Sequence, residues 1–196
     1  MITAAAGDPA AVGDPAGAPV ADPAWFFGYG SLMWRPGFAH DAAEPARLDG
    51  WHRALCIYSH HYRGTPERPG LVLGLAPGRS CVGRAMAAPR HREPEILAYL
   101  DERELFGAYV YDRLLLPVTL LRTGQTAQAW CYVAKPDHEQ YAGDLDEAAV
   151  LRHVQGGHGS AGACADYVRN TVAHLREMGI GDARLEALVE RLGNDG

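Results

Sequence analysis

The sequence predicts an α+β fold, a mainly antiparallel sheet or small β-barrel with flanking helices. Two observations carry this prediction. Strand-like segments dominate the first half of the chain, whereas amphipathic helical patterns fill the last third. The composition, 47% hydrophobic and 21% charged over 196 residues, is that of a globular domain large enough to bury a core.

We expect the folded domain to span residues 25–192, after a leader at 1–24. The leader consists almost wholly of Ala, Pro, Gly and Asp and contains no Lys or Arg. This composition is typical of disorder, and it lacks the positive and apolar regions of a signal peptide. No apolar run of the length needed for a membrane-spanning helix follows, so we expect no membrane association.

The formal net charge of −6 argues against broad binding to nucleic acid or to anionic membranes. The cysteines are well separated and form no C-x-x-C pair, which argues against a zinc site or a redox motif. They are Cys56, Cys81, Cys131 and Cys164. Their apolar or small neighbours predict buried free thiols in a reducing cytoplasm, and no cofactor.

The predicted strands begin at 25–27, an aromatic run that ends at a glycine. Residues 53–58 form the next candidate, followed by 71–75 and 81–87. The link at 77–80, with sequence Pro-Gly-Arg-Ser, is short and rich in turn formers, so we expect the last two strands to form a hairpin.

A helix is predicted over 94–103, because Pro94 suits a first helical turn and acidic residues lie beside it. Two long apolar segments follow, at 109–122 and 127–134. The polar residues between them contain a glycine, which indicates an antiparallel pair of strands.

The last third is predicted to be helical. One short helix spans 146–154, before two glycines. A second, over 165–178, repeats apolar residues at helical spacing and ends at a glycine. Asp182 is the expected N-cap of a third helix that continues to Leu192.

The run Phe27-Gly28-Tyr29-Gly30-Ser31-Leu32 is the first candidate for function. Glycines just after a strand allow a sharp turn, and successive N–H groups in such a turn can hold an anionic or carbonyl oxygen. A purely structural turn is the alternative. The run matches neither a dinucleotide-binding G-x-G-x-x-G motif nor a P-loop, and Ser31 does not match the G-x-S-x-G elbow of serine hydrolases.

The second candidate is the polar loop at 59–66, which lies between two predicted strands. Arg63 is suited to binding a substrate carboxylate, and pairing of Arg63 with a nearby acid is an equally weighted alternative. His60 and His61 would point to opposite sides of an extended chain, and no third ligand is evident, so we predict no metal site.

The third candidate is Glu104, at the end of the predicted helix. Leu97, Leu100 and Glu104 follow helical spacing, which places the carboxyl group on the apolar face. An apolar setting raises the pKa of a carboxyl group and suits it to proton transfer near neutral pH. Asp101 lies near the same face and is a rival candidate, whereas Arg103 is expected to be solvated or ion-paired.

Together these motifs resemble the ChaC-type γ-glutamylcyclotransferases, over roughly residues 25–192. The run 27–38 resembles the opening motif of that family. Ser59-x-x-x-Arg63-Gly64-Thr65-Pro66 resembles the second motif, and Tyr99-Leu100-x-x-Arg103-Glu104 with Tyr109 resembles the third. Gly179-Ile180-x-Asp182 resembles the C-terminal helix signature.

The resemblance implies a small mixed β-barrel that releases 5-oxoproline from a γ-glutamyl compound, above all glutathione, without metal or cofactor. Glu104 would be the catalytic acid and base. The other residues that the resemblance places at the substrate are Gly28, Tyr29, Gly30, Ser31, Leu32, Met33, Ser59, Arg63 and Tyr109.

The sequence departs from the family pattern at two places, of which the second, 105–108, concerns the pocket beyond the γ-glutamyl group. Residues 162–165 lack an Asn that relatives often carry, and 105–108 lack a Gly-Gly pair. Ring closure on another γ-glutamyl amine or peptide is therefore an alternative function. A non-catalytic cation-transport regulator on the same fold is a second alternative, and the sequence leaves the oligomeric state open.

Overall fold

The computed structural model describes residues 22–105 and 110–193. Within these residues, strands close into a barrel in the order β1-β3-β2-β4-β5. The barrel strands are β1 (Ala24–Gly28), β2 (Ala42–Ser59), β3 (Gly70–Ala88), β4 (Tyr111–Leu120) and β5 (Thr126–Ala134). A separate two-stranded sheet pairs β6 (His158–Gly159) with β7 (Gly162–Ala163). The predicted small barrel is confirmed.

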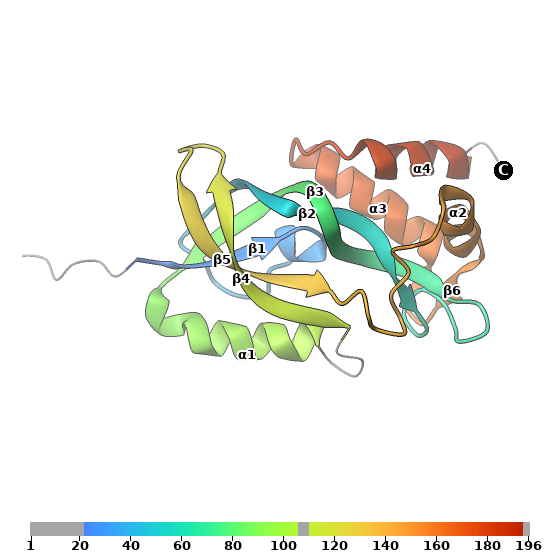
Figure 1. Ribbon diagram of the computed structural model, residues 1–196, viewed down its shortest axis with the longest axis horizontal. Coiled ribbons are helices and arrows are strands. Elements are labelled where there is room, and N and C mark those ends of the chain that lie inside the picture. The colour runs from blue at the N-terminus through green and yellow to red at the C-terminus, as the bar shows by residue number, and fades with distance from the viewer. Residues whose placement is uncertain (1–21, 106–109, 194–196) are drawn as a thin grey trace, which may run out of the picture.

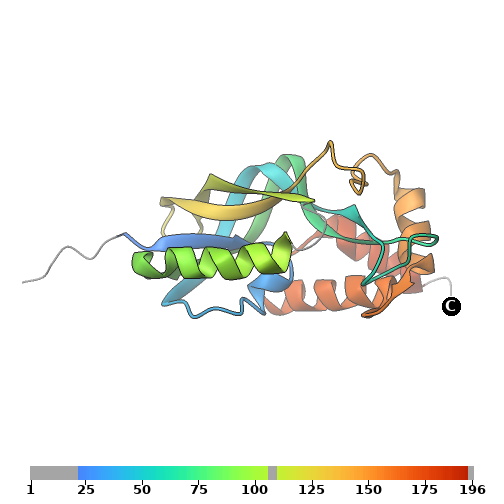
Figure 2. The same ribbon diagram turned by 90° about the horizontal axis from the view of Figure 1, so that it is seen from below.

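Helices flank the barrel on two sides (Figures 1 and 2). The α-helices are α1 (Glu93–Glu104), α2 (Glu147–Gly156), α3 (Cys164–Glu177) and α4 (Ala183–Gly193), and the short 3₁₀ helices are η1 (Ser31–Met33) and η2 (Arg90–Arg92). In both views α1 lies along the barrel, and α2, α3 and α4 gather on the other side. The C-terminal end of α1 therefore points toward the helical half of the molecule.

The predicted hairpin at 77–80 is wrong, because 70–88 form one continuous strand, β3. Gly78 and Arg79 adopt positive φ angles of 93° and 60°. Asp49 pairs with Ser80 and Trp51 pairs with Pro77, so that Gly78 and Arg79 together lie opposite Gly50 alone. The turn-forming residues thus produce a β-bulge, which bends the long β2–β3 ribbon without reversing it.

The barrel closes through a parallel pairing of β1 with β5, in which Trp25 pairs with Ala129. All other barrel pairings are antiparallel within the described residues. One face of β1 packs against α1, where Phe26, Ile96 and Leu100 are almost fully buried. This packing fixes the end of α1 relative to the residues that follow β1.

The helix boundaries follow the predicted signals closely. Pro94 lies in the first turn of α1. Asp146 caps α2, since its carboxylate accepts a hydrogen bond from the Ala149 N–H at 2.7 Å. Asp182 caps α4 in the same way, accepting from the Leu185 N–H at 3.2 Å. Both caps satisfy N–H groups that the helix itself cannot pair.

The four cysteines are free and buried, as predicted. None of the helices in the described ranges combines the length and the apolar character that crossing a membrane requires. Residues 1–21 of the predicted leader lie outside the described residues.

Candidate active site

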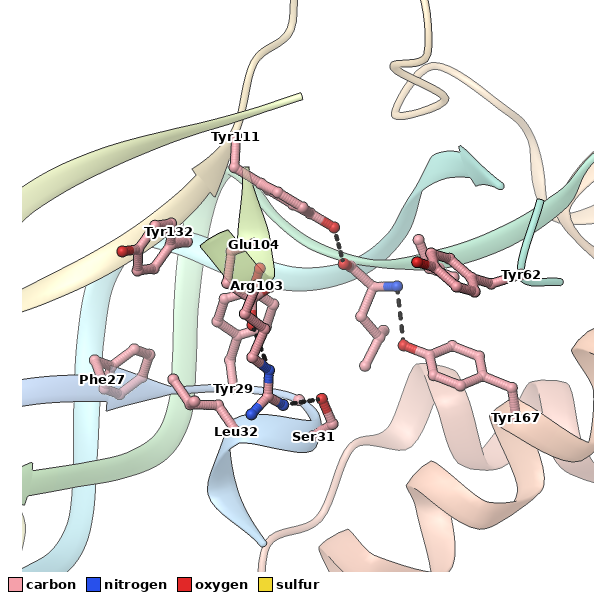
Figure 3. Close-up of a pocket in the computed structure, with 13 residues that line it drawn as sticks. Phe27, Tyr29, Ser31, Leu32, Tyr62, Arg103, Glu104, Tyr111, Tyr132 and Tyr167 are labelled. Atoms are coloured by element: carbon pink, nitrogen blue, oxygen red, sulfur yellow. Dashed lines mark hydrogen bonds and ion pairs between the residues drawn. The ribbon is translucent and has the colours of Figure 1, made fainter. Parts of the chain in front are cut away.

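A cavity of about 270 Å³ opens where the end of β1, the end of α1, β3 and α3 meet (Figure 3). Polar and aromatic side chains surround it. The lining residues are Phe27, Tyr29, Gly30, Ser31, Leu32, Tyr62, Val72, Leu73, Arg103, Glu104, Tyr111, Tyr132 and Tyr167. Residues 29–32 of the first candidate motif and Glu104 of the third thus come together in one cavity.

The glycine-containing loop leaves β1 and enters η1 directly. The Met33 N–H donates to the Gly30 carbonyl at 2.9 Å, which closes this tight turn. A Cβ atom on Gly28 would lie 3.1 Å from the Met33 nitrogen, so a larger residue would require this turn to shift by a few tenths of an ångström. Within residues 22–105 and 110–193, the N–H groups of Gly30 and Leu32 have no hydrogen-bond acceptor. These donors are available to a polar ligand.

Arg53 of β2 supports this loop from behind. Its Nε donates to the Tyr29 carbonyl at 2.5 Å, and another guanidinium nitrogen donates to the Val82 carbonyl at 2.8 Å. The Arg53 side chain is 3% exposed. Sequence reasoning missed this role, since a buried charge within a strand leaves no local signature; an arginine inside an otherwise apolar strand is the only signal.

Glu104 is the last residue of α1, one turn after the buried Leu100. The packing of α1 against β1 therefore carries the carboxyl group to the cavity. Burial raises the pKa of Glu104, and the nearby Arg103 guanidinium opposes this rise. The Arg103 Nε lies 3.2 Å from the Glu104 carboxylate. A carboxyl group with a raised pKa can accept and return a proton near neutral pH.

Two tyrosine hydroxyls hold the same residue of β3 (Figure 3). Tyr111 donates to the Leu73 carbonyl at 2.9 Å, and Tyr167 accepts from the Leu73 N–H at 3.2 Å. Burial raises the pKa of Tyr111 well above 10 and that of Tyr167 to about 12. Both phenols are therefore neutral at physiological pH and act as hydrogen-bonding walls of the cavity.

Asp101, the rival of Glu104, already has two partners. The Tyr132 hydroxyl donates to its carboxylate at 2.6 Å, and Arg113 forms an ion pair with it. Asp101 is not among the residues that line the cavity. The geometry therefore favours Glu104 over Asp101 as the group that exchanges protons with a ligand.

A family model described as ChaC-like protein matches residues 24–194. The chain belongs to the ChaC-like family. Among its curated relatives is the glutathione-specific γ-glutamylcyclotransferase of Escherichia coli, which is 32% identical over 85% of this chain and 71% of the relative. The human glutathione-specific γ-glutamylcyclotransferase 1 is 29% identical over 86% of this chain and 78% of the relative.

The fold of this ChaC-like protein is also that of a solved relative. The crystal structure of a γ-glutamylcyclotransferase specific to glutathione from yeast superposes with a TM-score of 0.77. The match covers 88% of this chain and 96% of the yeast chain, at 21% sequence identity. The barrel with its flanking helices is therefore the architecture of a known protein.

The other predicted site residues of this ChaC-like protein are not among the residues that line the cavity. Ser59 ends β2, and its hydroxyl accepts from the Arg63 N–H at 3.0 Å. Arg63 lies over the Tyr167 ring, 5.1 Å from its centroid, and donates to the Ala161 carbonyl. Met33 is fully buried, and Tyr109 lies outside the described residues. Gly28, Met33, Ser59 and Arg63 are not among the lining residues, so substrate contact by each stays a prediction.

A larger cavity, of about 600 Å³, lies between β2, α2 and α4. Its carboxylates have structural partners. Asp146 caps α2, and Glu147 lies 3.7 Å from Arg191. The smaller cavity is lined by a carboxyl group of raised pKa and by residues whose N–H groups lack an acceptor among the described residues, so it is the candidate active site.

Proposed function

We propose that this ChaC-like protein is a γ-glutamylcyclotransferase that converts glutathione into 5-oxoproline and cysteinylglycine. The names of the bacterial and human relatives support the substrate. The arrangement of Glu104 opposite the Gly30–Leu32 loop supports the chemistry. The presence of free buried cysteines fits a reducing compartment, and we propose the cytoplasm.

The substrate supplies its own nucleophile in this reaction. The α-amine of the γ-glutamyl group attacks the γ-carbonyl carbon, a C–N bond forms, and the amide bond to cysteine breaks. The five-membered ring leaves as 5-oxoproline. Because the attack is intramolecular, the protein has to hold the γ-glutamyl chain in a folded conformation, and this orientation lowers the barrier.

Glu104 would move the protons. Its carboxylate takes the two protons that the attacking ammonium nitrogen loses, one before the attack and one as the ring closes, and passes each in turn to the nitrogen of the leaving dipeptide, which departs as an ammonium group. The protons balance within this single carboxyl group, so no water molecule is consumed. Burial suits Glu104 to both steps, since its raised pKa brings the acid and the base forms closer in energy near neutral pH.

The loop after β1 would hold the reacting carbonyl. The N–H groups of Gly30 and Leu32, which have no acceptor in the part of the chain that the structure describes, would donate to the oxygen on which negative charge develops. Such fixed donors stabilise a tetrahedral intermediate without reorganising during the reaction. The observation that carries the proposal is that the residues bearing these donors and Glu104 line the same cavity.

The test is 5-oxoproline release from glutathione by the purified protein, compared with Glu104→Gln. We expect the wild type to release 5-oxoproline and the variant to lose about 10²–10⁴-fold in kcat/KM, the usual contribution of acid–base catalysis. Glu102→Gln is the matched control, because Glu102 is exposed on the same helix. It should retain activity.

Each other outcome has a defined meaning. Equal activity of the wild type and Glu104→Gln would overturn the role of Glu104. If folded wild-type protein released nothing from glutathione but acted on another γ-glutamyl amine, the ring closure would stand and the substrate assignment would fall. Inactivity on every γ-glutamyl compound would overturn the proposal as a whole.

A further inference from the structure

Arg103 connects the Glu104 carboxyl group with the loop that follows β1. Its Nε lies 3.2 Å from the Glu104 carboxylate, and one terminal nitrogen donates to the Ser31 hydroxyl at 3.0 Å (Figure 3). The other terminal nitrogen donates to the Arg35 carbonyl at 2.6 Å. One guanidinium thus contacts the Glu104 carboxylate, one residue of the Gly30–Leu32 loop and the segment that follows η1.

We propose that Arg103 is the positioning residue of the reaction, which holds the Glu104 carboxylate at a fixed distance from the Gly30–Leu32 loop. This inference rests on the proposed function. The planar guanidinium supports it, because its nitrogens point in fixed directions and can bind a carboxylate and a loop at once. A lysine offers one flexible ammonium group and could not hold both partners in the same geometry.

Arg103 also has an electrostatic effect on Glu104. Among the described residues, the titratable groups that face this carboxyl group from other elements are the phenols of Tyr29, Tyr111 and Tyr167, all of which are neutral near pH 7 because burial raises their pKa values. Arg103 is thus the charged group that counteracts burial and lowers the pKa of Glu104. Its removal should raise that pKa further.

A merely structural role of Arg103 would give a different result in a titration of Glu104. Arg103 also contacts the Tyr99 hydroxyl at 3.2 Å and the Pro36 carbonyl, contacts that stabilise the segment after η1. If these contacts were its whole contribution, replacing Arg103 would lower the melting temperature but leave the titration of Glu104 unchanged. The proposal requires the titration to move.

The experiment is an NMR titration of the Glu side-chain carboxyl carbons in the wild type, Arg103→Gln and Arg103→Lys, with Glu104→Gln used to assign the signal. We expect the Glu104 midpoint to rise in Arg103→Gln and to return toward the wild-type value in Arg103→Lys, which keeps the charge. Arg92→Gln is the matched control, since Arg92 pairs with Glu95 at the other end of α1. It should leave the midpoint unchanged.

Kinetics on glutathione complete the test. In Arg103→Gln the acidic limb of the kcat/KM profile should move to higher pH, so that activity below the limb falls about tenfold for each pH unit of movement. Arg103→Lys should recover the position of the limb but keep a reduced kcat, because the contact with Ser31 is lost. Ser31→Ala should lower kcat without moving the limb.

Two results would overturn the inference. An unchanged Glu104 midpoint in Arg103→Gln would reduce Arg103 to a structural residue. Full recovery of kcat in Arg103→Lys would show that charge alone matters and that the fixed geometry does not. Because the titration needs no substrate, failure of the proposed function would appear separately, as a wild type that shows the expected midpoints but releases no 5-oxoproline.

Discussion

The Arg53 guanidinium lies 3.1 Å from the Asp182 carboxylate, and this ion pair links the loop after β1 to the start of α4. Arg53 binds the Tyr29 carbonyl with a second nitrogen, while Asp182 caps α4 with its other carboxylate oxygen. The two side chains are 3% and 14% exposed. A buried ion pair therefore connects the candidate site to a helix far away in the sequence.

We expect Arg53→Met to lower the free energy of unfolding by about 3–5 kcal/mol, because it leaves the Asp182 carboxylate buried without its partner. Urea denaturation would measure this loss. Arg169→Met is the control, since the Arg169–Asp166 pair is 44% and 67% exposed and should cost less than about 1 kcal/mol. Equal effects of the two substitutions would contradict the structural importance of the Arg53 pair.

Glu104→Gln should make the protein more stable at neutral pH even as it removes activity. Burial raises the pKa of Glu104 above its ordinary value of 4.5, so the native state keeps this proton to higher pH than the unfolded chain does. The free energy of unfolding therefore falls as pH rises through the interval between the two pKa values, and ionised Glu104 destabilises the native state at pH 7.

The measurement is the melting temperature of both proteins from pH 8 downward. We expect the advantage of Glu104→Gln to be largest near pH 8 and to shrink as pH falls toward 4.5, because Glu104 is first protonated in the native state and then, near 4.5, in the unfolded chain as well. If Glu104→Gln melted below the wild type by the same amount at every pH, burial of the ionised Glu104 carboxylate would not destabilise the native state.

Tyr111→Phe should destabilise the protein by about 1–3 kcal/mol, because it leaves the Leu73 carbonyl without its donor. Thermal unfolding followed by circular dichroism would measure this. Tyr62→Phe is a suitable control, since Tyr62 also lines the cavity but is 61% exposed. A loss as large in Tyr62→Phe would show that stability depends on the cavity wall in general and not on the Leu73 contact.

Leu100→Ala should cost about 2–5 kcal/mol in the free energy of unfolding, because the side chain is almost fully buried between α1 and the barrel. Since Leu100 is one turn before Glu104, kcat should fall as well. Leu121→Ala, at a residue that is 45% exposed, should change neither quantity appreciably. Wild-type stability in Leu100→Ala would contradict the packing described for α1.

Sequence reasoning predicted the elements whose signals are local. The end of α1 at Glu104 and the caps Asp146 and Asp182 follow from residue types that satisfy helix termini. It failed at 77–80, because a glycine with positive φ suits both a hairpin and a bulge. Only the opposite strand decides between the two, and Gly50 lies far away in the sequence.

The residues of the candidate site fall into the same two groups, those with a local sequence pattern and those without one. Glu104 and the Gly30–Leu32 loop could be predicted because each has a local pattern, and the resemblance to a family joined them. The contributions of Arg53, Tyr111 and Tyr167 depend on pairings between distant segments, which no local pattern encodes. These residues come together only when β1 pairs with β5 and α3 packs against β3.

The burial of the cysteines affects how well the protein would resist oxidation during the proposed reaction. A catalyst that consumes glutathione depletes the thiol that protects proteins from oxidation. Thiolates are the forms that oxidants attack, and burial raises the pKa of Cys56 to about 12 and raises those of Cys81, Cys131 and Cys164 as well. All four thiols are buried and protonated at neutral pH, so the proposed activity would continue while the surroundings become more oxidising.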